Sequence, residues 1–477
     1  MKLTLFMFFV CFFIRVSSSF GDNLPPALVF KMETPYDKDI SIKVENEPVF
    51  KSDTVLTPLT LTTQRPILVS IGAQTKKIKI EKIYKNKDIP IDVVFADKTV
   101  RYTLKTLPDV FPKFTVKNPS AQSGFVLISL YGLKLTDPSF SFILDMNGNV
   151  VYYRGHPEIK RSMFHLKKVV LPNGKIRYIT HVQDGFGLDD SYVIGYHLIM
   201  DENFNEIDRV ELLKTEQHEA LKADEHDILM IDDGHYIVIG HDVVEKILED
   251  GQKSLVTHTV IQEQKDGIVL LDWDAKNYPQ LEANCYEKCP ADNLKNADYI
   301  HPNSLFIDPK DNNILVSAAS GFYVMKIHRM TGDVLWILGG KINQFKWPTE
   351  DRFIRQHDVQ LLSDGRLMLF DNHYTTLSQK DLDKHKIQYK PMNARIMIFD
   401  WNEDEKIIKS IETIPLNFSA NYMGSVQKLN NNRWFIGCGS SNTCTARMID
   451  KNGKVLWNMK AKQPYKMFRT YFYNSLK

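Results

Sequence analysis

Short apolar runs alternate with polar turns along most of this 477-residue chain, a pattern typical of β-strands rather than helices. Beyond about residue 125, a turn rich in Asp, Asn and Gly is followed repeatedly by an alternating strand. Six copies of this turn and strand occur, 50 to 71 residues apart. Because this spacing suits one four-stranded blade with its loops, the repeat predicts an all-β fold with a six-bladed β-propeller over residues 116–477. The alternative is an all-β chain in which such turns recur by chance. The six copies lie at Asp145, Asp201, Asp272, Arg329, Asp400 and Asp450.

The segments before the repeat differ in character. Residues 20–115 contain short alternating strands, such as ISIKVEN, between prolines and polar turns, and predict a small N-terminal β-sandwich domain. The proline-containing stretch Leu107–Pro112 is the expected linker. In residues 1–19, Lys2 precedes a largely apolar run from Leu3 to Ile14 and then three serines, which predicts a signal peptide and is too short to span a membrane. We therefore expect a secreted or periplasmic protein.

Composition excludes few classes. A formal net charge of +2 and 25% charged residues give no large basic field, so nucleic acid is not an expected partner. No later stretch is long and apolar enough for a membrane span, and the sequence leaves a homodimer open.

Four cysteines remain after removal of the signal peptide, and they form two close pairs. In an oxidising compartment we expect two short-loop disulfides, Cys285 with Cys289 and Cys438 with Cys444. A four-cysteine zinc site is the competing interpretation, but neither spacing has the usual Cys-x2-Cys form.

The strongest candidate chemistry is a histidine at one register of three similar segments. His226 and His357 are each followed by Asp, an apolar run and an Asp-Gly turn, and His301 is followed by Pro302-Asn303 before a strand. In a radial β-architecture the same register lies at the same distance from the axis, so we expect the three imidazoles to converge. For any single histidine a hydrogen-bonded structural role is the simpler interpretation.

Two chemistries suit converging imidazoles, and their spacing does not separate them. One is nucleophilic transfer, in which one neutral imidazole attacks an electrophile such as sulfur and its neighbours stabilise the developing charge. The other is a three-histidine zinc site of a lyase or hydrolase. A non-catalytic propeller that binds a partner is a third interpretation.

Several segments in combination resemble the arylsulfate sulfotransferase family. They are Glu225-His226-Asp227, Tyr299 to Ser304, the Trp336-Ile337-Leu338-Gly339-Gly340 stretch, and Gln356-His357-Asp358, and the similarity runs over about residues 130 to 460. The resemblance implies an aryl sulfate donor, a phenolic acceptor, and neither a metal nor another cofactor. It makes His357 the nucleophile that forms a transient sulfohistidine, with the sulfate oxygens held by His226, His301 and Asn303.

One departure from that family concerns charge. The arginine that the family carries in the strand after the His-x-Asn motif is not matched in residues 316–321, and an arginine fork is a strong contact for sulfate. Arg355, two residues before His357, is a candidate replacement; the alternative is an exposed arginine with no such role. Cationic His226 and His301 would lower the pKa of His357, whereas the neighbouring aspartates would raise it, and the sequence does not decide the sum.

Overall fold

The computed structural model describes residues 111–118, 123–132, 137–148, 150–155, 163–186, 192–247, 251–289, 296–462 and 465–476, together with seven strands between residues 28 and 106. The signal-peptide prediction for residues 1–19 and most of the predicted linker lie outside the described residues. Strands dominate the described part, which confirms the all-β prediction. The α-helices described, α1 (Pro279–Ala283) and α2 (Gln379–His385), are short, and no helix in these ranges is both long and apolar enough to cross a membrane.

Two antiparallel sheets account for the strands before residue 107. One has the order β3-β1-β7-β6 and the other β2-β4-β5. Their packing as a β-sandwich stays a prediction. The strands are β1 (Leu28–Met32), β2 (Ile40–Val44), β3 (Thr54–Val55), β4 (Ile67–Ile71), β5 (Gln74–Ile78), β6 (Ile89–Val94) and β7 (Thr99–Thr106).

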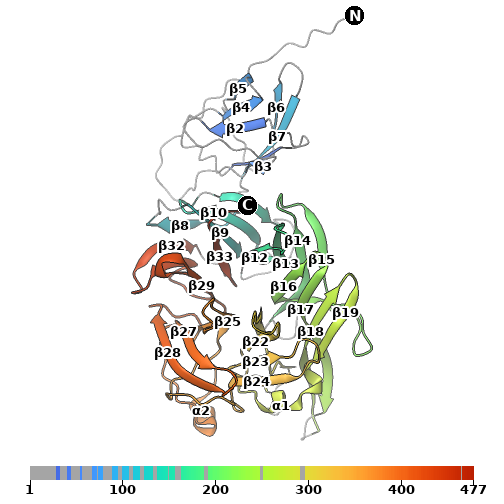
Figure 1. Ribbon diagram of the computed structural model, residues 1–477, viewed down its shortest axis with the longest axis vertical. Helices are drawn as coiled ribbons and strands as arrows, with labels where there is room; N and C mark the ends of the chain where they lie inside the picture. Colours follow the sequence, from blue (N-terminus) through green and yellow to red (C-terminus); the bar gives the residue numbers. More distant parts are fainter. Residues whose placement is uncertain are drawn as a thin grey trace, which may run out of the picture.

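The remaining strands form sheets in a propeller-like arrangement, antiparallel except for the pairing of β18 with β20 (Figure 1). Four of these sheets have the size of a single blade. The first contains β9 (Phe125–Leu130), β10 (Phe140–Asp145), β11 (Val150–Gly155) and β33 (Thr470–Tyr473). The second contains β21 (Pro302–Ile307), β22 (Ile314–Ala318), β23 (Tyr323–Ile327) and β24 (Val334–Gly339). The third contains β25 (His357–Leu361), β26 (Leu367–Asp371), β27 (Arg395–Asn402) and β28 (Ile407–Pro415). The fourth contains β29 (Ser425–Leu429), β30 (Arg433–Gly437), β31 (Ala446–Asp450), β32 (Val455–Ala461) and β8 (Phe114–Lys117).

The prediction of six separate blades is wrong. Between the first and second of these sheets, the chain forms one nine-stranded sheet instead of two blades. The two units counted by the repeat are joined because β14 pairs with β16 through Ile194 opposite Asp224 and Gly195 opposite Ala223. A repeat of turns in the sequence predicts hairpins, but it does not predict whether neighbouring hairpins pair with each other. The strands of this sheet are β12 (Met163–Val170), β13 (Ile176–Phe186), β14 (Val193–Met200), β15 (Glu206–Val210), β16 (Ala223–Asp232), β17 (His235–Ile247), β18 (Lys253–Lys265), β19 (Ile268–Asp274) and β20 (Asn296–Ala297).

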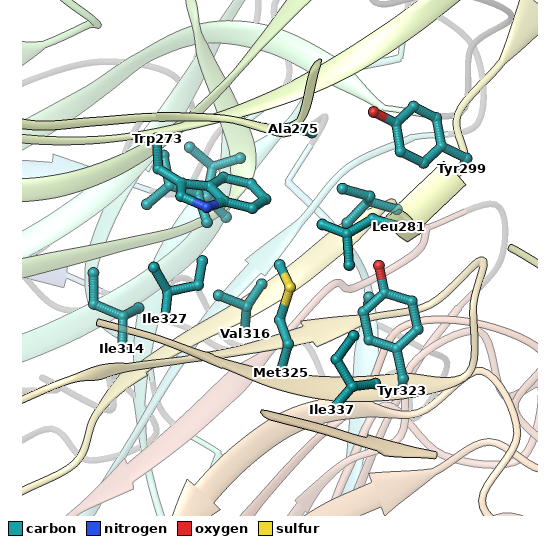
Figure 2. Close-up of a cluster of buried hydrophobic side chains, with 14 of the residues drawn as sticks. Trp273, Ala275, Leu281, Tyr299, Ile314, Val316, Tyr323, Met325, Ile327 and Ile337 are labelled. Atoms are coloured by element: carbon teal, nitrogen blue, oxygen red, sulfur yellow. The ribbon is translucent and has the colours of Figure 1, made fainter. Parts of the chain in front are cut away.

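The core consists of apolar layers between neighbouring sheets. Strands β22, β23 and β26 are buried at every position, whereas the edge strand β28 is buried only at Ile408 and Ile414. In one such layer Trp273 of β19 faces Val316 of β22 and Met325 of β23 (Figure 2). Closely packed layers of this kind fix the inner strands relative to one another, and the site depends on that.

Candidate functional site

The three predicted histidines lie within or next to the first four residues of three inner strands. His226 is in β16, His301 immediately precedes β21, and His357 is the first residue of β25. The pairing register of each strand with its neighbour shifts at this point, and His301 has a left-handed φ of 50°. A β-bulge redirects side chains, so the common sequence register corresponds to a common irregularity of the backbone.

Two of the imidazoles flank one phenylalanine, and the third lies beside the first of them. The ring centroids of His226 and His301 are 4.9 Å apart, and the ring of Phe468 lies 5.1 Å from His226 and 6.4 Å from His357. His226 and His357 are buried, and the His301 side chain is 19% exposed. These spacings bring the rings within reach of one small ligand.

His357 has a defined tautomer. Its Nδ1 contacts two oxygens that can only accept hydrogen bonds, Asn372 Oδ1 at 2.8 Å and the Arg355 carbonyl at 3.1 Å, so Nδ1 carries the proton. The orientation of the Asn372 amide is fixed because its Nδ2 donates to the carbonyls of Ala420 and Met423, both at 2.8 Å. Nε2 therefore has the lone pair, and it accepts a hydrogen bond from the Met423 N–H at 3.1 Å.

The other two histidines have carboxylate partners. Nδ1 of His226 lies 2.7 Å from Asp224 Oδ1, and Nδ1 of His301 lies 2.6 Å from Asp298 Oδ2. Burial opposes a charge on His226, but the Asp224 and Glu225 carboxylates outweigh it and raise its pKa to about 9. For His301, burial and the positive charge of His226 together outweigh the effect of the Asp298 carboxylate, so the pKa of His301 is lowered.

The pKa of His357 is well below its usual range. Burial is the main cause, and the charges of His226, Arg469 and His301 add to it, whereas the hydrogen bond to Asn372 acts in the opposite direction. This settles the balance that the sequence left open. The site thus combines a neutral imidazole on His357 with an imidazolium on His226 at neutral pH.

The two aspartates that follow His226 and His357 tie neighbouring inner strands together. Asp227 Oδ2 accepts the N–H of Leu305 at 3.0 Å, and Asp358 Oδ2 accepts the N–H of Val426 at 2.8 Å. Asp227 and Asp358 therefore fix the neighbouring inner strand, whereas the imidazoles themselves are oriented by Asp224 and Asn372.

The other two predicted site residues, Asn303 and Arg355, have different kinds of partner. The buried Asn303 donates from Nδ2 to the Gln356 carbonyl at 2.7 Å, which places it beside the backbone that leads into His357. Arg355 is paired with Glu287, with Nε 3.0 Å from Oε2, and stacks over the ring of Tyr374. Its charge is therefore already balanced by a carboxylate.

Sequence reasoning missed the residues that orient the histidines. Asp224 and Asp298 stand two and three residues before their histidines, and this recurring acidic residue is a signal that could have been used. Asn372 directly follows β26, and a strand end facing the axis could have suggested it. Phe468 and Arg469 come from the C-terminal segment and carry no repeat signal.

Compact metal-ligand sets are few in the part of the chain that the structure describes. Ligand atoms within 4.8 Å of one another occur in two sets, Asp224-Glu225-His226 and Asp308-Asp311-Glu403. The second is filled by Lys326, whose Nζ lies 2.7 Å from both aspartates. The three histidines do not form such a set among the described residues, so their arrangement is not that of a three-histidine zinc site.

Both predicted disulfides are confirmed. Cys285 is bonded to Cys289 and Cys438 to Cys444. Two disulfides are typical of proteins from an oxidising compartment and are consistent with an extracellular or periplasmic location.

Fold and site together define a propeller-like all-β protein with a histidine-rich centre suited to nucleophilic group transfer. The family model "Arylsulfotransferase (ASST)" matches residues 112–447, more than half of the chain. The chain belongs to the arylsulfotransferase family, which confirms the resemblance inferred from sequence and indicates arylsulfotransferase activity at the level of the family.

More distant similarity is limited to solved structures. No curated protein matches the chain. A protein of unknown function from Bacteroides caccae is 11% identical, with 73% of this chain and 99% of that chain covered and a TM-score of 0.37. A quinonprotein alcohol dehydrogenase-like protein from Bacteroides thetaiotaomicron is 9% identical, with coverages of 94% and 92% and a TM-score of 0.35. Virginiamycin B lyase from Staphylococcus aureus is 11% identical, with coverages of 73% and 99% and a TM-score of 0.27.

Proposed function

We propose that the protein is a nucleotide-independent sulfotransferase that moves a sulfuryl group from an aryl sulfate to a phenol through a sulfohistidine on His357. The observation that carries this proposal is the state of His357, a neutral imidazole with its proton on Nδ1 and its lone pair on Nε2. Such a nitrogen can attack sulfur without first losing a proton.

The reaction has two balanced steps. The His357 Nε2 lone pair forms a bond to sulfur while the bond from sulfur to the aryl oxygen breaks, and the aryl oxide leaves with that electron pair and takes up a proton from solvent. The acceptor phenol then gives its proton to solvent, and its oxygen attacks the same sulfur. The N–S bond breaks, and its electron pair returns to Nε2.

Attack requires the hydrogen bond between the Met423 N–H and Nε2 to open. Once Nε2 is bonded to sulfur, this N–H is free to donate to a sulfuryl oxygen, as a backbone donor of an oxyanion hole does. Met423 lies in the loop between β28 and β29 and has a left-handed φ of 65°. Asn372 holds the carbonyl of the same residue, so one side chain orients both the nucleophile and this donor.

His226, His301 and Asn303 are the residues that we assign to the sulfuryl oxygens. His226 has a pKa of about 9 and is therefore a cation at neutral pH. It can balance the negative charge of the sulfuryl oxygens, as the arginine that the family pattern leads us to expect would do. Arg355 stays a weaker candidate because Glu287 already balances its charge.

We also propose that residues 1–19 are a signal peptide, that residues 20–115 form a β-sandwich domain, and that residues 116–477 form the catalytic domain. The apolar N-terminal run and the two disulfides support a secretory route.

The test is to trap the intermediate. Incubating the full chain with 4-nitrophenyl sulfate and no acceptor should release nitrophenol and add about 80 Da to the peptide containing His357, the covalent intermediate of nucleophilic catalysis. His357→Ala should abolish both signals, and transfer should survive treatment with a chelator. As a matched control, His235→Ala changes a histidine that is held by Glu263, and it should leave both signals intact. Nitrophenol release with no adduct, together with full transfer by His357→Ala, would refute the nucleophile assignment.

A further inference from the structure

A buried arginine beyond the family-matched region contacts all three histidine-bearing segments. Arg469 precedes β33 and is 2% exposed. Its Nη1 lies 3.0 Å from Asp227 Oδ2 and 3.7 Å from Asp358 Oδ1, and its Nη2 donates to the carbonyl of Asn303. One guanidinium thus joins the residue after His226, the residue after His357, and the His-x-Asn segment of His301.

The neighbouring residue belongs to the same arrangement. Phe468 is the aromatic ring that His226 and His357 flank, and its carbonyl accepts the N–H of Gly424, in the loop that contains Met423. The guanidinium of Arg469 lies 5.1 Å from the Phe468 ring centroid. Residues 468 and 469 therefore complete the site, although the family match ends at residue 447.

The surroundings of Arg469 distinguish positioning from sulfate binding. Its two terminal nitrogens are engaged by Asp227 and by the Asn303 carbonyl. Asp227 is shared with Lys167, whose Nζ lies 2.7 Å from Oδ1, so two cations and two aspartates nearly neutralise one another. Because Nη1 and Nη2 are both engaged, the guanidinium cannot offer this pair of nitrogens to a sulfate, but it can fix the relative placement of three strands.

We propose that Arg469 is a positioning residue that holds the segments of His226, His301 and His357 in register for sulfuryl transfer. This inference rests on the proposed function. A shift of about 1 Å between reacting groups can cost about 10²-fold in rate, so loss of the fork should reduce kcat far more than it weakens donor binding.

The experiment compares Arg469→Lys with Arg177→Lys. Lysine keeps the charge but cannot span three partners, and Arg177 is a matched buried arginine with a two-contact pair to Asp233. We expect Arg469→Lys to lower kcat for 4-nitrophenyl sulfate about 10²-fold with KM changed less than about threefold, and Arg177→Lys to leave both unchanged. An unchanged kcat in a folded Arg469→Lys variant, or a raised KM with normal kcat, would overturn the proposal.

Two further measurements keep the test decisive. If Arg469→Lys does not fold, Asp358→Asn removes one charge partner and retains an oxygen for the Val426 N–H, and it should lower kcat in the same selective way. If the unaltered protein releases no phenol from any aryl sulfate, the proposed function is wrong. The positioning role of Arg469 is then tested separately by ¹⁵N NMR of labelled histidine. Arg469→Lys must then change the tautomer of His357 or the titration of His226, whereas Arg177→Lys must not. If the histidine spectra of Arg469→Lys are identical to those of the unaltered protein, the inference is wrong.

Discussion

Replacing Asp224 by Asn should turn His226 from a cation into a neutral residue at physiological pH. Asp224 Oδ1 contacts both Nδ1 and the backbone N–H of His226, at 2.7 and 2.8 Å. The amide retains an acceptor oxygen and removes the charge. Without that carboxylate burial prevails, and we expect the pKa of His226 to fall from about 9 to below its usual 6.5.

The size of the effect follows from the difference between the folded and unfolded states. A pKa of about 9 against 6.5 in the unfolded chain corresponds to about 3 kcal/mol favouring the folded imidazolium. Because this pKa is raised on folding, the contribution is complete below about pH 6.5 and is lost as the pH rises through about 9. Asp224→Asn should therefore cost about 3 kcal/mol of unfolding free energy near pH 6 and much less near pH 10.

Two assays check this prediction. NMR titration of the histidines gives the pKa of His226 directly, and denaturant unfolding at several pH values gives the stability difference. Sulfuryl transfer at pH 7.5 should also fall about 10²-fold, as it does when one donor to a developing oxyanion is lost. The matched control is Asp272→Asn, which removes the carboxylate 2.8 Å from His218 Nε2. If His226 still titrates near 9 in Asp224→Asn, or if the stability difference is the same at pH 6 and pH 10, the electrostatic account of the site is wrong.

Three further predictions concern individual interactions. Asn372→Leu should remove the acceptor for His357 Nδ1 and lower the rate of adduct formation about 10²-fold, measured by rapid-quench mass spectrometry; an unchanged rate would contradict the tautomer assignment. Lys326→Met should destabilise the protein by about 3 kcal/mol because it leaves the buried Asp308 carboxylate without its cation beside the carboxylates of Asp311 and Glu403, and a thermal unfolding temperature equal to that of the parent would count against this. Cys438→Ser should cost about 2 kcal/mol in denaturant unfolding because the disulfide closes a short loop, and no change under oxidising conditions would refute it.

The positions of the three histidines could be predicted because residues at the same register of repeated units lie at the same distance from the axis of the fold. His226, His301 and His357 share that register; the rings of His226 and His357 flank Phe468, and the ring of His301 lies 4.9 Å from that of His226. The disulfides could be predicted for a similar local reason, since each closes a loop of only a few residues. The number of separate sheets could not, because the pairing of β14 with β16 depends on contacts between hairpins rather than within them.

The sequence by itself therefore determined the strand-rich fold class, the family and the common register of the histidines, all of which depend on short-range patterns. The tertiary structure decided which imidazole is neutral and which is charged. Burial keeps His357 neutral, with help from the nearby charges of His226 and Arg469, whereas the Asp224 and Glu225 carboxylates overcome burial and keep His226 charged. It also decided the place of Arg469, which is 111 or more residues from each of its partners in sequence and meets them only when the ring closes through β33. Charges act through space, so His226 and Arg469, which are distant from His357 in sequence, help to lower its pKa.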